Sequence, residues 1–365
     1  MKIGTDQYNT FDTMTMDCWN DRVYYEGKEF PAGHFAAEIL NFAGVIHDPL
    51  LERITVLTAL VDDLSTAEKS KRHDIAAQLK PLLHDTVSWL YTCPPFCYCE
   101  SQGAYEDLEH ALSEERLDRD YEEREEHLPF MALSFCEPIL RILVAIYNFC
   151  LLIRAFEKKY LRRAKRRNAD AFAKAAHECF DEDDSFLILL EQMPFGEVEE
   201  FFSYPRVITG FKYFQDENDE EKWKTAQRVI CKRAIDFYVF DLMNGLHHGH
   251  APSQCQGCGR YFLTTNGHIP KYCDGVAPQD DRYTCRQYGA MMHQKEQNKQ
   301  HPVYRLFNTR TGTIRKHHQR GKISDDLRRE ALYLAESYRD KALMDNDYAA
   351  DGYARDMELE HIYAE

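Results

Sequence analysis

A long apolar segment in the middle of the chain, from Leu128 to Phe156, constrains the fold more than any other feature. Its sequence, LPFMALSFCEPILRILVAIYNFCLLIRAF, has to be buried in protein or in lipid, because so much apolar surface is unstable in water. The acidic run before it and the basic run after it would suit a spanning helix. However, Glu137, Arg141 and Asn148 interrupt the segment, and no charge-free stretch reaches the roughly 18 residues that a span requires. We therefore predict a buried central helix and no insertion in a membrane.

Most of the first 250 residues are predicted to be helical, because their apolar residues recur three and four positions apart. The same periodicity predicts one more helix in EEKWKTAQRVICKRAIDFYVFDLMNG, which starts at Glu220 and should stop near Gly245. The segment ISDDLRREALYLAESYRDKALM carries an N-terminal capping signal at Ser324. The clearest helical segments of the body are HFAAEILNFAGVI from His34, LLERITVLTALVDDL from Leu50 and DIAAQLKPLLHDTVSWLY from Asp74.

The composition is that of a folded globular protein whose cysteines are reduced. The chain has 365 residues, 44% of them hydrophobic, and 12 cysteines. The start, MKIGTDQYNTFDTMTMDCWND, has no apolar region of the kind that a secretory signal contains. We therefore expect a cytoplasmic protein, in which thiols stay reduced and serve as small hydrophobic residues or as metal ligands.

Four cysteines within about thirty residues form the clearest candidate site. Cys255 and Cys258 stand three positions apart in CQGCGRYF, and Cys273 and Cys285 follow. Zinc prefers four soft ligands in a tetrahedron, and a tight C-x-x-C turn directs two sulfurs at one centre. Eleven residues, DGVAPQDDRYT, separate the last two cysteines, so this half must be a looped-out knuckle. The spacing predicts a structural Zn²⁺ site made of these four residues.

Other interpretations of the four cysteines remain open from the sequence. A thiol-disulfide catalyst also uses C-x-x-C, but at a helix N-terminus in a βαβ unit. A catalytic zinc site would need an open position for water, which four cysteines do not leave. The four thiols could also lack a metal altogether. If the long loop does not close, His268 or His293 could replace Cys285, although both are expected to be ordinary surface histidines.

A second group of cysteines, Cys93, Cys97 and Cys99, lies in TCPPFCYCE, with His84 upstream. Three thiols and a histidine could hold another zinc ion. The spacing is irregular, and the two prolines indicate a rigid loop. We therefore predict that these cysteines are structural and carry no metal.

The net charge of −16 is distributed unevenly along the chain. Residues 254–330 contain 14 Lys and Arg against 7 Asp and Glu, a net charge of +7 that leaves −23 for the remainder. A second basic cluster, EKKYLRRAKRR from Glu157, could contact nucleic acid, but in so acidic a chain it is expected to pair with the acidic segment at 104–127. Within residues 254–330, the candidate contacts to nucleic-acid phosphates are Arg305, Arg310, Arg315, Lys316, Arg320 and Lys322.

Taken together, these patterns predict a mainly α fold, with a helical body, a small inserted zinc-ribbon-like module and a helical C-terminal tail. The predicted domains are an acidic body at 1–250, the four-cysteine module at 251–292, and a basic segment with C-terminal helices at 293–365. The chain has no P-loop, no G-x-G-x-x-G, no H-E-x-x-H and no G-x-S-x-G. An enzyme is therefore the less favoured class.

The combination CQGCGRYFL, KYCDG and YTCRQYGA, followed by HPVY and RKHHQRGKIS, resembles an uncharacterised family of Firmicutes proteins. Those proteins carry a zinc-ribbon-like module near the C-terminus, and the resemblance covers residues 255–345. It implies zinc at Cys255, Cys258, Cys273 and Cys285, including the long gap before the last ligand. It implies no activity.

Two functions follow as expectations. The first is a zinc protein that associates with nucleic acid through the basic segment after the cysteines, with weak sequence specificity because no base-reading helix is evident. The second is an intracellular interaction or scaffold protein, in which zinc is purely structural and the basic segment meets acidic groups of the protein itself or of a partner.

Overall fold

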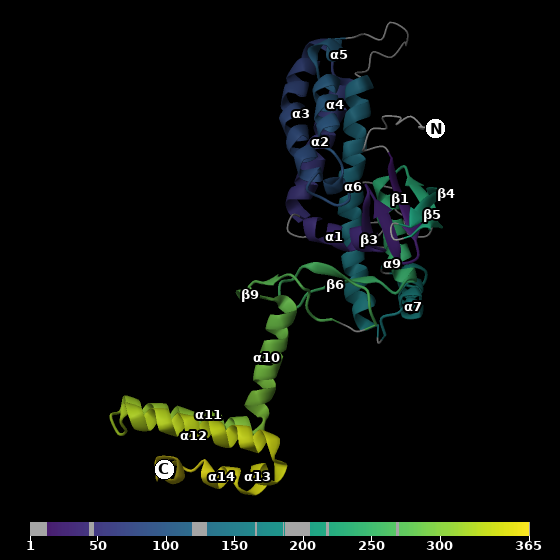
Figure 1. Cartoon of the computed structure of the whole chain (residues 1–365). Coiled ribbons are helices and arrows are strands. Elements are labelled where there is room, and N and C mark those ends of the chain that lie inside the picture. Colours follow the sequence, from purple (N-terminus) through teal and green to yellow (C-terminus); the bar gives the residue numbers. More distant parts are fainter. Residues whose placement is uncertain are drawn as a thin grey trace. The chain divides into compact units, whose positions relative to one another are not determined.

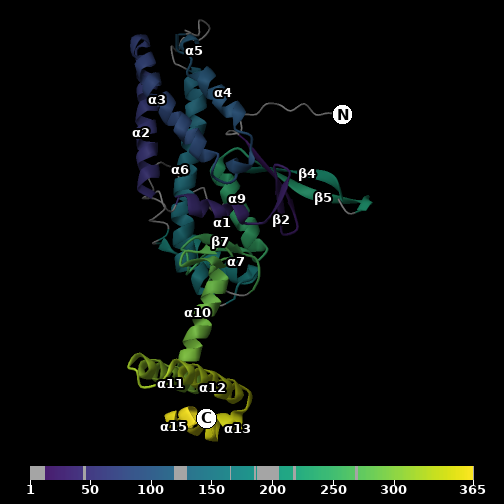
Figure 2. The ribbon, with the colours of Figure 1, turned by 60° about the vertical axis from the view of Figure 1, so that its left-hand side comes forward.

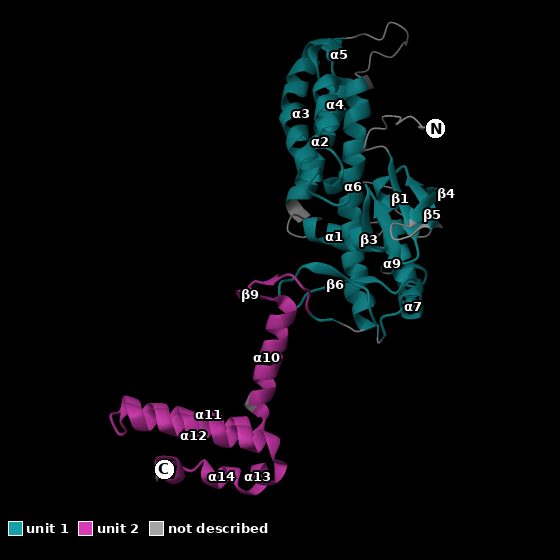
Figure 3. Cartoon of the chain, viewed as in Figure 1, with its two compact units in different colours: residues 1–271 teal, residues 272–365 magenta. Residues whose placement is uncertain are grey.

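The chain is mainly helical, as predicted (Figure 1). A cluster of four cysteines lies in its C-terminal half. The computed structural model describes residues 13–364 except 44–46, 119–129, 165, 185, 187–204, 217–218 and 268–269. Two compact units are present, unit 1 at Met1–Lys271 and unit 2 at Tyr272–Glu365 (Figure 3). The three domains predicted from the sequence, at 1–250, 251–292 and 293–365, remain predictions.

Unit 1 contains the helical body. Two 3₁₀ turns, η1 (Phe96–Tyr98) and η2 (Leu161–Arg163), connect some of its helices. The three clearest helical segments of the sequence correspond to α1, α2 and α3 and are confirmed. The helices are α1 (His34–Ala43), α2 (His47–Thr66), α3 (Lys69–Leu90), α4 (Gln102–Ala111), α5 (Glu114–Asp118), α6 (Phe130–Lys159), α7 (Ala169–Phe180) and α9 (Ala234–His247).

The central helix α6 is the predicted apolar segment, and α1, α2, α4 and α9 pack against it (Figure 2). Among the described residues, the helical stretch Met131–Arg163 is long and apolar enough to cross a membrane, and 67% of its most apolar window is buried inside the protein. The absence of membrane insertion remains a prediction. Fully buried side chains of α6 include Cys136, Ile139, Leu143, Ile146, Phe149, Ile153 and Phe156.

A five-stranded antiparallel sheet was not predicted. Its strand order is β3-β2-β1-β5-β4, and β1 pairs with β5 although more than 200 residues separate them in sequence, Met14 lying opposite Cys231. The long hairpin of β4 and β5 extends away from the helices (Figure 2). The strands are β1 (Met14–Trp19), β2 (Arg22–Tyr25), β3 (Lys28–Pro31), β4 (Val207–Asp216) and β5 (Asp219–Cys231).

The helix expected from Glu220 to Gly245 is therefore wrong over its first half, because β5 occupies Asp219–Cys231 and α9 begins at Ala234. The pairing of β5 with β1 and β4 supplies its backbone hydrogen bonds, and this long-range effect outweighs local helical periodicity. The expected stop at Gly245 is also wrong, since α9 continues to His247 and Gly249 takes the positive φ of 77° just beyond it. Gly245 serves close packing instead: a Cβ there would lie 2.8 Å from the Cα of Gly33.

The acidic segment at 104–127 contributes to two short helices, α4 and α5, and its leucines Leu108, Leu112 and Leu117 are buried. The remainder of that segment, 119–129, lies outside the described residues. The basic cluster at 157–167 was expected to pair with this acidic segment, but it does not pair with the part that the structure describes. Within the described residues, the ion pairs of the cluster join Lys159 to Asp183 and Arg162 to Glu157.

Unit 2 is a helical assembly after a small hairpin of β8 (Val276–Ala277) and β9 (Asp280–Thr284). Ser324 caps α12 as predicted, because its hydroxyl accepts a hydrogen bond from the Leu327 amide at 3.2 Å. The small core includes Val303, Ile314 and Tyr353, whose hydroxyl donates to the Val303 carbonyl at 3.0 Å. The helices are α10 (Cys285–Gln300), α11 (Pro302–Gln319), α12 (Asp325–Met344), α13 (Asn346–Asp351), α14 (Tyr353–Asp356) and α15 (Leu359–Ala364).

A buried carboxyl group joins α9 to the start of α1. Asp241 is fully buried, and its two oxygens accept hydrogen bonds from the amides of Gly33 at 3.0 Å and Ala36 at 2.9 Å. These amides have no partner within the helix, so Asp241 stabilises the N-terminus of α1. Burial raises the pKa of Asp241 to about 7, and the amide donors act in the opposite direction.

This pKa shift predicts a pH dependence of stability. Because the pKa of Asp241 is higher in the folded than in the unfolded chain, its contribution is complete below about pH 4 and is lost as the pH rises through about 7. We expect the free energy of unfolding of wild type, relative to Asp241→Asn, to fall between pH 4 and pH 8. Chemical denaturation of both proteins across this range measures the difference. A difference that stays constant, or that rises with pH, would contradict the expected shift.

Candidate metal centre

The first half of the centre is a two-stranded ribbon, β6 (Ala251–Gln254) and β7 (Tyr261–Thr264), with the C-x-x-C turn between the strands. The amide of Cys255 donates to the Arg260 carbonyl at 2.8 Å, which closes the turn. The amide of Gly257 points at the Cys255 sulfur, with a distance of 3.4 Å. Gly259 has a φ of 75°, a conformation that glycine adopts at little cost.

The second half brings Cys273 and Cys285 together by looping out the residues between them. Eleven residues form the hairpin of β8 and β9, and Cys285 is the first residue of α10. Two backbone hydrogen bonds close the loop, from the Cys285 amide to the Gly275 carbonyl at 2.7 Å and from the Arg286 amide to the Cys273 carbonyl at 3.0 Å. Thr284 and Gln287 form a capping box that fixes the start of α10.

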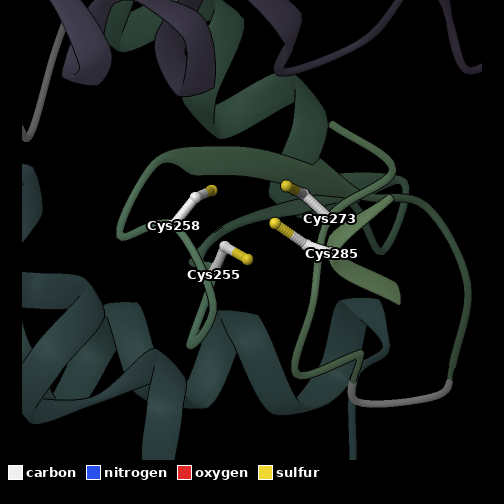
Figure 4. Close-up of side chains that lie close together, drawn as sticks. All are labelled: Cys255, Cys258, Cys273 and Cys285. Atoms are coloured by element: carbon white, nitrogen blue, oxygen red, sulfur yellow. The ribbon is translucent and has the colours of Figure 1, made fainter. Parts of the chain in front are cut away.

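The four sulfur atoms converge on one point (Figure 4). All of them lie within 4.8 Å of one another, and Cys255, Cys273 and Cys285 are buried while Cys258 is partly exposed. In a tetrahedron with bonds of about 2.3 Å, neighbouring sulfurs would be about 3.8 Å apart. The arrangement could therefore hold a metal ion, and with four protein ligands it would leave no coordination position for water or substrate.

Two of the alternative interpretations lose support from this geometry. Strands flank the C-x-x-C turn on both sides, whereas a thiol-disulfide catalyst places its first cysteine at a helix N-terminus. The long loop closes, so no histidine is needed in place of Cys285. His293 lies exposed on α10, and His268 is outside the described residues.

Contacts from unit 1 position the ribbon, and the sequence analysis missed them. The side chain of Asn41 on α1 forms two hydrogen bonds with the backbone of Tyr261, donating to its carbonyl at 2.9 Å and accepting from its amide at 2.7 Å. Arg167 donates to the Thr264 hydroxyl at 3.1 Å and to the Pro252 carbonyl at 3.3 Å. These residues are far from the ribbon in sequence, and no local pattern marks them as its partners.

The remaining cysteines differ from these four in their environment. All twelve lie in the described part of the chain and none is in a disulfide. Burial raises the pKa of Cys18, Cys136 and Cys150 to about 12, so these thiols stay protonated at neutral pH and act as small core residues.

The second cysteine group does not converge in the described structure. Burial raises the pKa of Cys93 to about 12, and its thiol donates to the Trp89 carbonyl. Cys99 contacts the Tyr25 hydroxyl at 3.3 Å, whereas Cys97 is exposed. The ring of His84 packs against the ring of Tyr105.

The candidate nucleic-acid residues lie in unit 2. Arg305, Arg315, Lys316, Arg320 and Lys322 are exposed, and Arg310 is half-buried. None of the six forms an ion pair within the described residues, whereas Arg328 and Arg329 pair with Asp325 and Asp326. The sequence of α11, PVYRLFNTRTGTIRKHHQ, contains no acidic residue.

Replacing Cys93, Cys97 and Cys99 together with alanine should leave the metal content of the purified protein unchanged, because their thiols lack a common centre. Elemental analysis per folded chain measures it, with Cys258→Ser as the comparison that should lose metal. A loss of one equivalent in the triple variant would show that this group is a ligand set.

Comparison with known proteins places one match on the C-terminal part of the chain. Residues 203–365 match the model of a family of unknown function, DUF6076. The match includes residues 255–345, which carry the resemblance described above. Because the function of this family is unknown, the match implies no activity. No curated protein and no solved structure matches the chain. The function is therefore inferred from the residues of this chain and their arrangement.

Proposed function

We propose that the protein holds one structural zinc ion through Cys255, Cys258, Cys273 and Cys285. The observation that carries this proposal is the convergence of four sulfur atoms from two segments of the chain, the C-x-x-C turn and the loop that brings Cys273 and Cys285 together. Four thiolates suit zinc, which accepts a closed tetrahedral shell, whereas calcium and magnesium prefer oxygen ligands. The ion would stabilise the turn and the loop, which contain little apolar surface of their own.

We further propose that the protein binds the sugar-phosphate backbone of nucleic acids through one face of α11. With 3.6 residues per turn, Arg305 and Lys316 lie within about 20° of each other around the helix, and Arg315 lies about 80° to one side. Arg320 follows directly at the end of the helix. The opposite face, with Val303 and Ile314, is buried in the core of unit 2.

The charge pattern of this face supports phosphate as the ligand. Exposed cations that form no ion pair attract polyanions, and release of condensed counterions adds to the binding free energy. Contacts to phosphate carry no sequence information, so binding would be weakly specific. If the protein does not bind nucleic acid, the alternative function, that of an interaction or scaffold protein, is favoured.

The zinc proposal predicts one zinc ion per chain and its loss in Cys255→Ser, because one missing thiolate leaves an incomplete shell. Cys97→Ser is the matched control, since it removes a thiol outside the cluster. Elemental analysis gives the stoichiometry. Chelation should increase amide hydrogen exchange over residues 255–285 while the far-ultraviolet circular dichroism signal stays largely helical. Protein that is fully folded and contains no zinc would contradict the proposal.

The nucleic-acid proposal predicts that affinity for duplex DNA falls steeply with salt, with a logarithmic slope of about −0.9 per phosphate contact. Replacing Arg315, Lys316 and Arg320 together with glutamine should reduce the slope by about two to three units. The control changes the same charge elsewhere, with Lys71, Lys80 and Lys174 replaced by glutamine. Fluorescence anisotropy over a salt series measures both. An absence of binding at low salt would favour the interaction-protein function.

A further inference from the structure

A small hollow in unit 1 lies beside the cysteine ribbon, where the chain leaves α6. Its volume is about 290 Å³, and none of the residues that line it is acidic. Three cationic residues line it, Arg162, Arg167 and Lys271. The polar residues Ser253, Gln254 and Gln256 also line it.

Arg167 is the unusual member of this set. It is only 3% exposed, yet its recorded hydrogen bonds go to neutral acceptors, the Thr264 hydroxyl and the Pro252 carbonyl. No ion pair joins it to a carboxylate of the described residues, and its guanidinium lies over the ring of Phe172. The buried carboxylate of Glu157 acts on Arg167 through its charge, but its direct ion pair is with Arg162. A buried cation with no ion-pair partner of its own is costly, so its retention next to a hollow indicates a site for an anion.

The other two cations are partly or fully available. Arg162 binds Glu157, with a closest distance of 2.9 Å, but half of its side chain is exposed. It also donates to the Gln254 side chain at 3.2 Å. Lys271 is exposed, and no ion pair is recorded for it within the described residues. Its backbone carbonyl accepts from the Gln256 amide at 2.8 Å, which fixes its position at the edge of the hollow.

We propose that this hollow is a phosphate-binding subsite, in which Arg162, Arg167 and Lys271 bind the oxygens of one phosphate group. Two guanidinium groups and an ammonium group match the several oxygens of a phosphate better than the two oxygens of a carboxylate. The phosphate would come from a polynucleotide backbone or from a free nucleotide. The assignment uses no residue of α11 and stands independently of the function proposed for that helix.

One competing role has to be separated by experiment. Cys255 lines the same hollow, and a zinc ion with four thiolates would carry a net charge of −2. The same cations could therefore serve only to balance the charge of the metal centre. In that case their removal would lower zinc content, whereas removal of a phosphate ligand would not.

The test is titration of the full-length protein with inorganic phosphate by calorimetry at low ionic strength. Lys271→Gln is the informative variant, because this side chain is exposed, whereas loss of Arg167 would also loosen the ribbon. Wild type should bind one phosphate, and Lys271→Gln should bind it about tenfold more weakly, as expected for one charge-assisted hydrogen bond. Lys174→Gln, on the exposed surface of α7, should behave as wild type, and all three proteins should contain equal zinc.

Three results would overturn the assignment: no saturable phosphate binding by wild type, equal affinity in the two variants, or loss of zinc together with phosphate in Lys271→Gln.

Competition experiments then identify the molecule that carries the phosphate. Displacement of phosphate by single-stranded DNA but not by AMP supports a polynucleotide backbone, and displacement by AMP but not by single-stranded DNA supports a nucleotide. Displacement by neither would contradict a phosphate ester as the ligand. Phosphate binding that persists while DNA binding fails would refute only the function proposed for α11.

Discussion

The need to bury α6 on nearly every side determines the arrangement of unit 1. Each large apolar side chain removed from water contributes about 1.5 to 3 kcal/mol, and this helix buries many of them, including Ile146, Phe149 and Phe156. Helices α1, α2, α4 and α9 supply the covering surfaces. Helix α9 covers α6, and Asp241 of α9 caps α1. The same packing therefore fixes β3, which precedes α1, and β5, which precedes α9. The basic residues that follow α6 are thereby brought to the ribbon of β6 and β7.

The cysteine cluster depends on a different kind of constraint. The turn at Cys255 and the loop from Cys273 to Cys285 are stabilised by backbone hydrogen bonds and hold four sulfurs at one point, with little apolar surface around them. Four cysteines in this arrangement could hold a metal ion, whose charge would offset the mutual repulsion of four thiolates. Positive charge occurs in the hollow that Cys255 and Arg167 both line and again on α11, although the chain as a whole is acidic.

Local signals in the sequence predicted those features that depend on neighbours along the chain. The apolar run gave the central helix, Ser324 gave the start of α12, and the four cysteines gave the ligand set that converges. The sheet was missed because β1 and β5 are more than 200 residues apart, and their pairing leaves no local signal. For the same reason, periodicity assigned β5 to a helix. The contacts of Asn41 and Arg167 with the ribbon could not be predicted either, since each is an isolated polar residue whose partner is distant in sequence.

X-ray absorption at the zinc edge of the purified protein is the decisive measurement, because it reports the ligand atoms of the metal in solution. If the four cysteines bind zinc, the spectrum will show a shell of four sulfur atoms at about 2.3 Å and no nitrogen or oxygen ligand. A shell that includes nitrogen or oxygen would show that a histidine or water replaces one of the four cysteines. A protein that binds no zinc at all would refute the metal centre altogether.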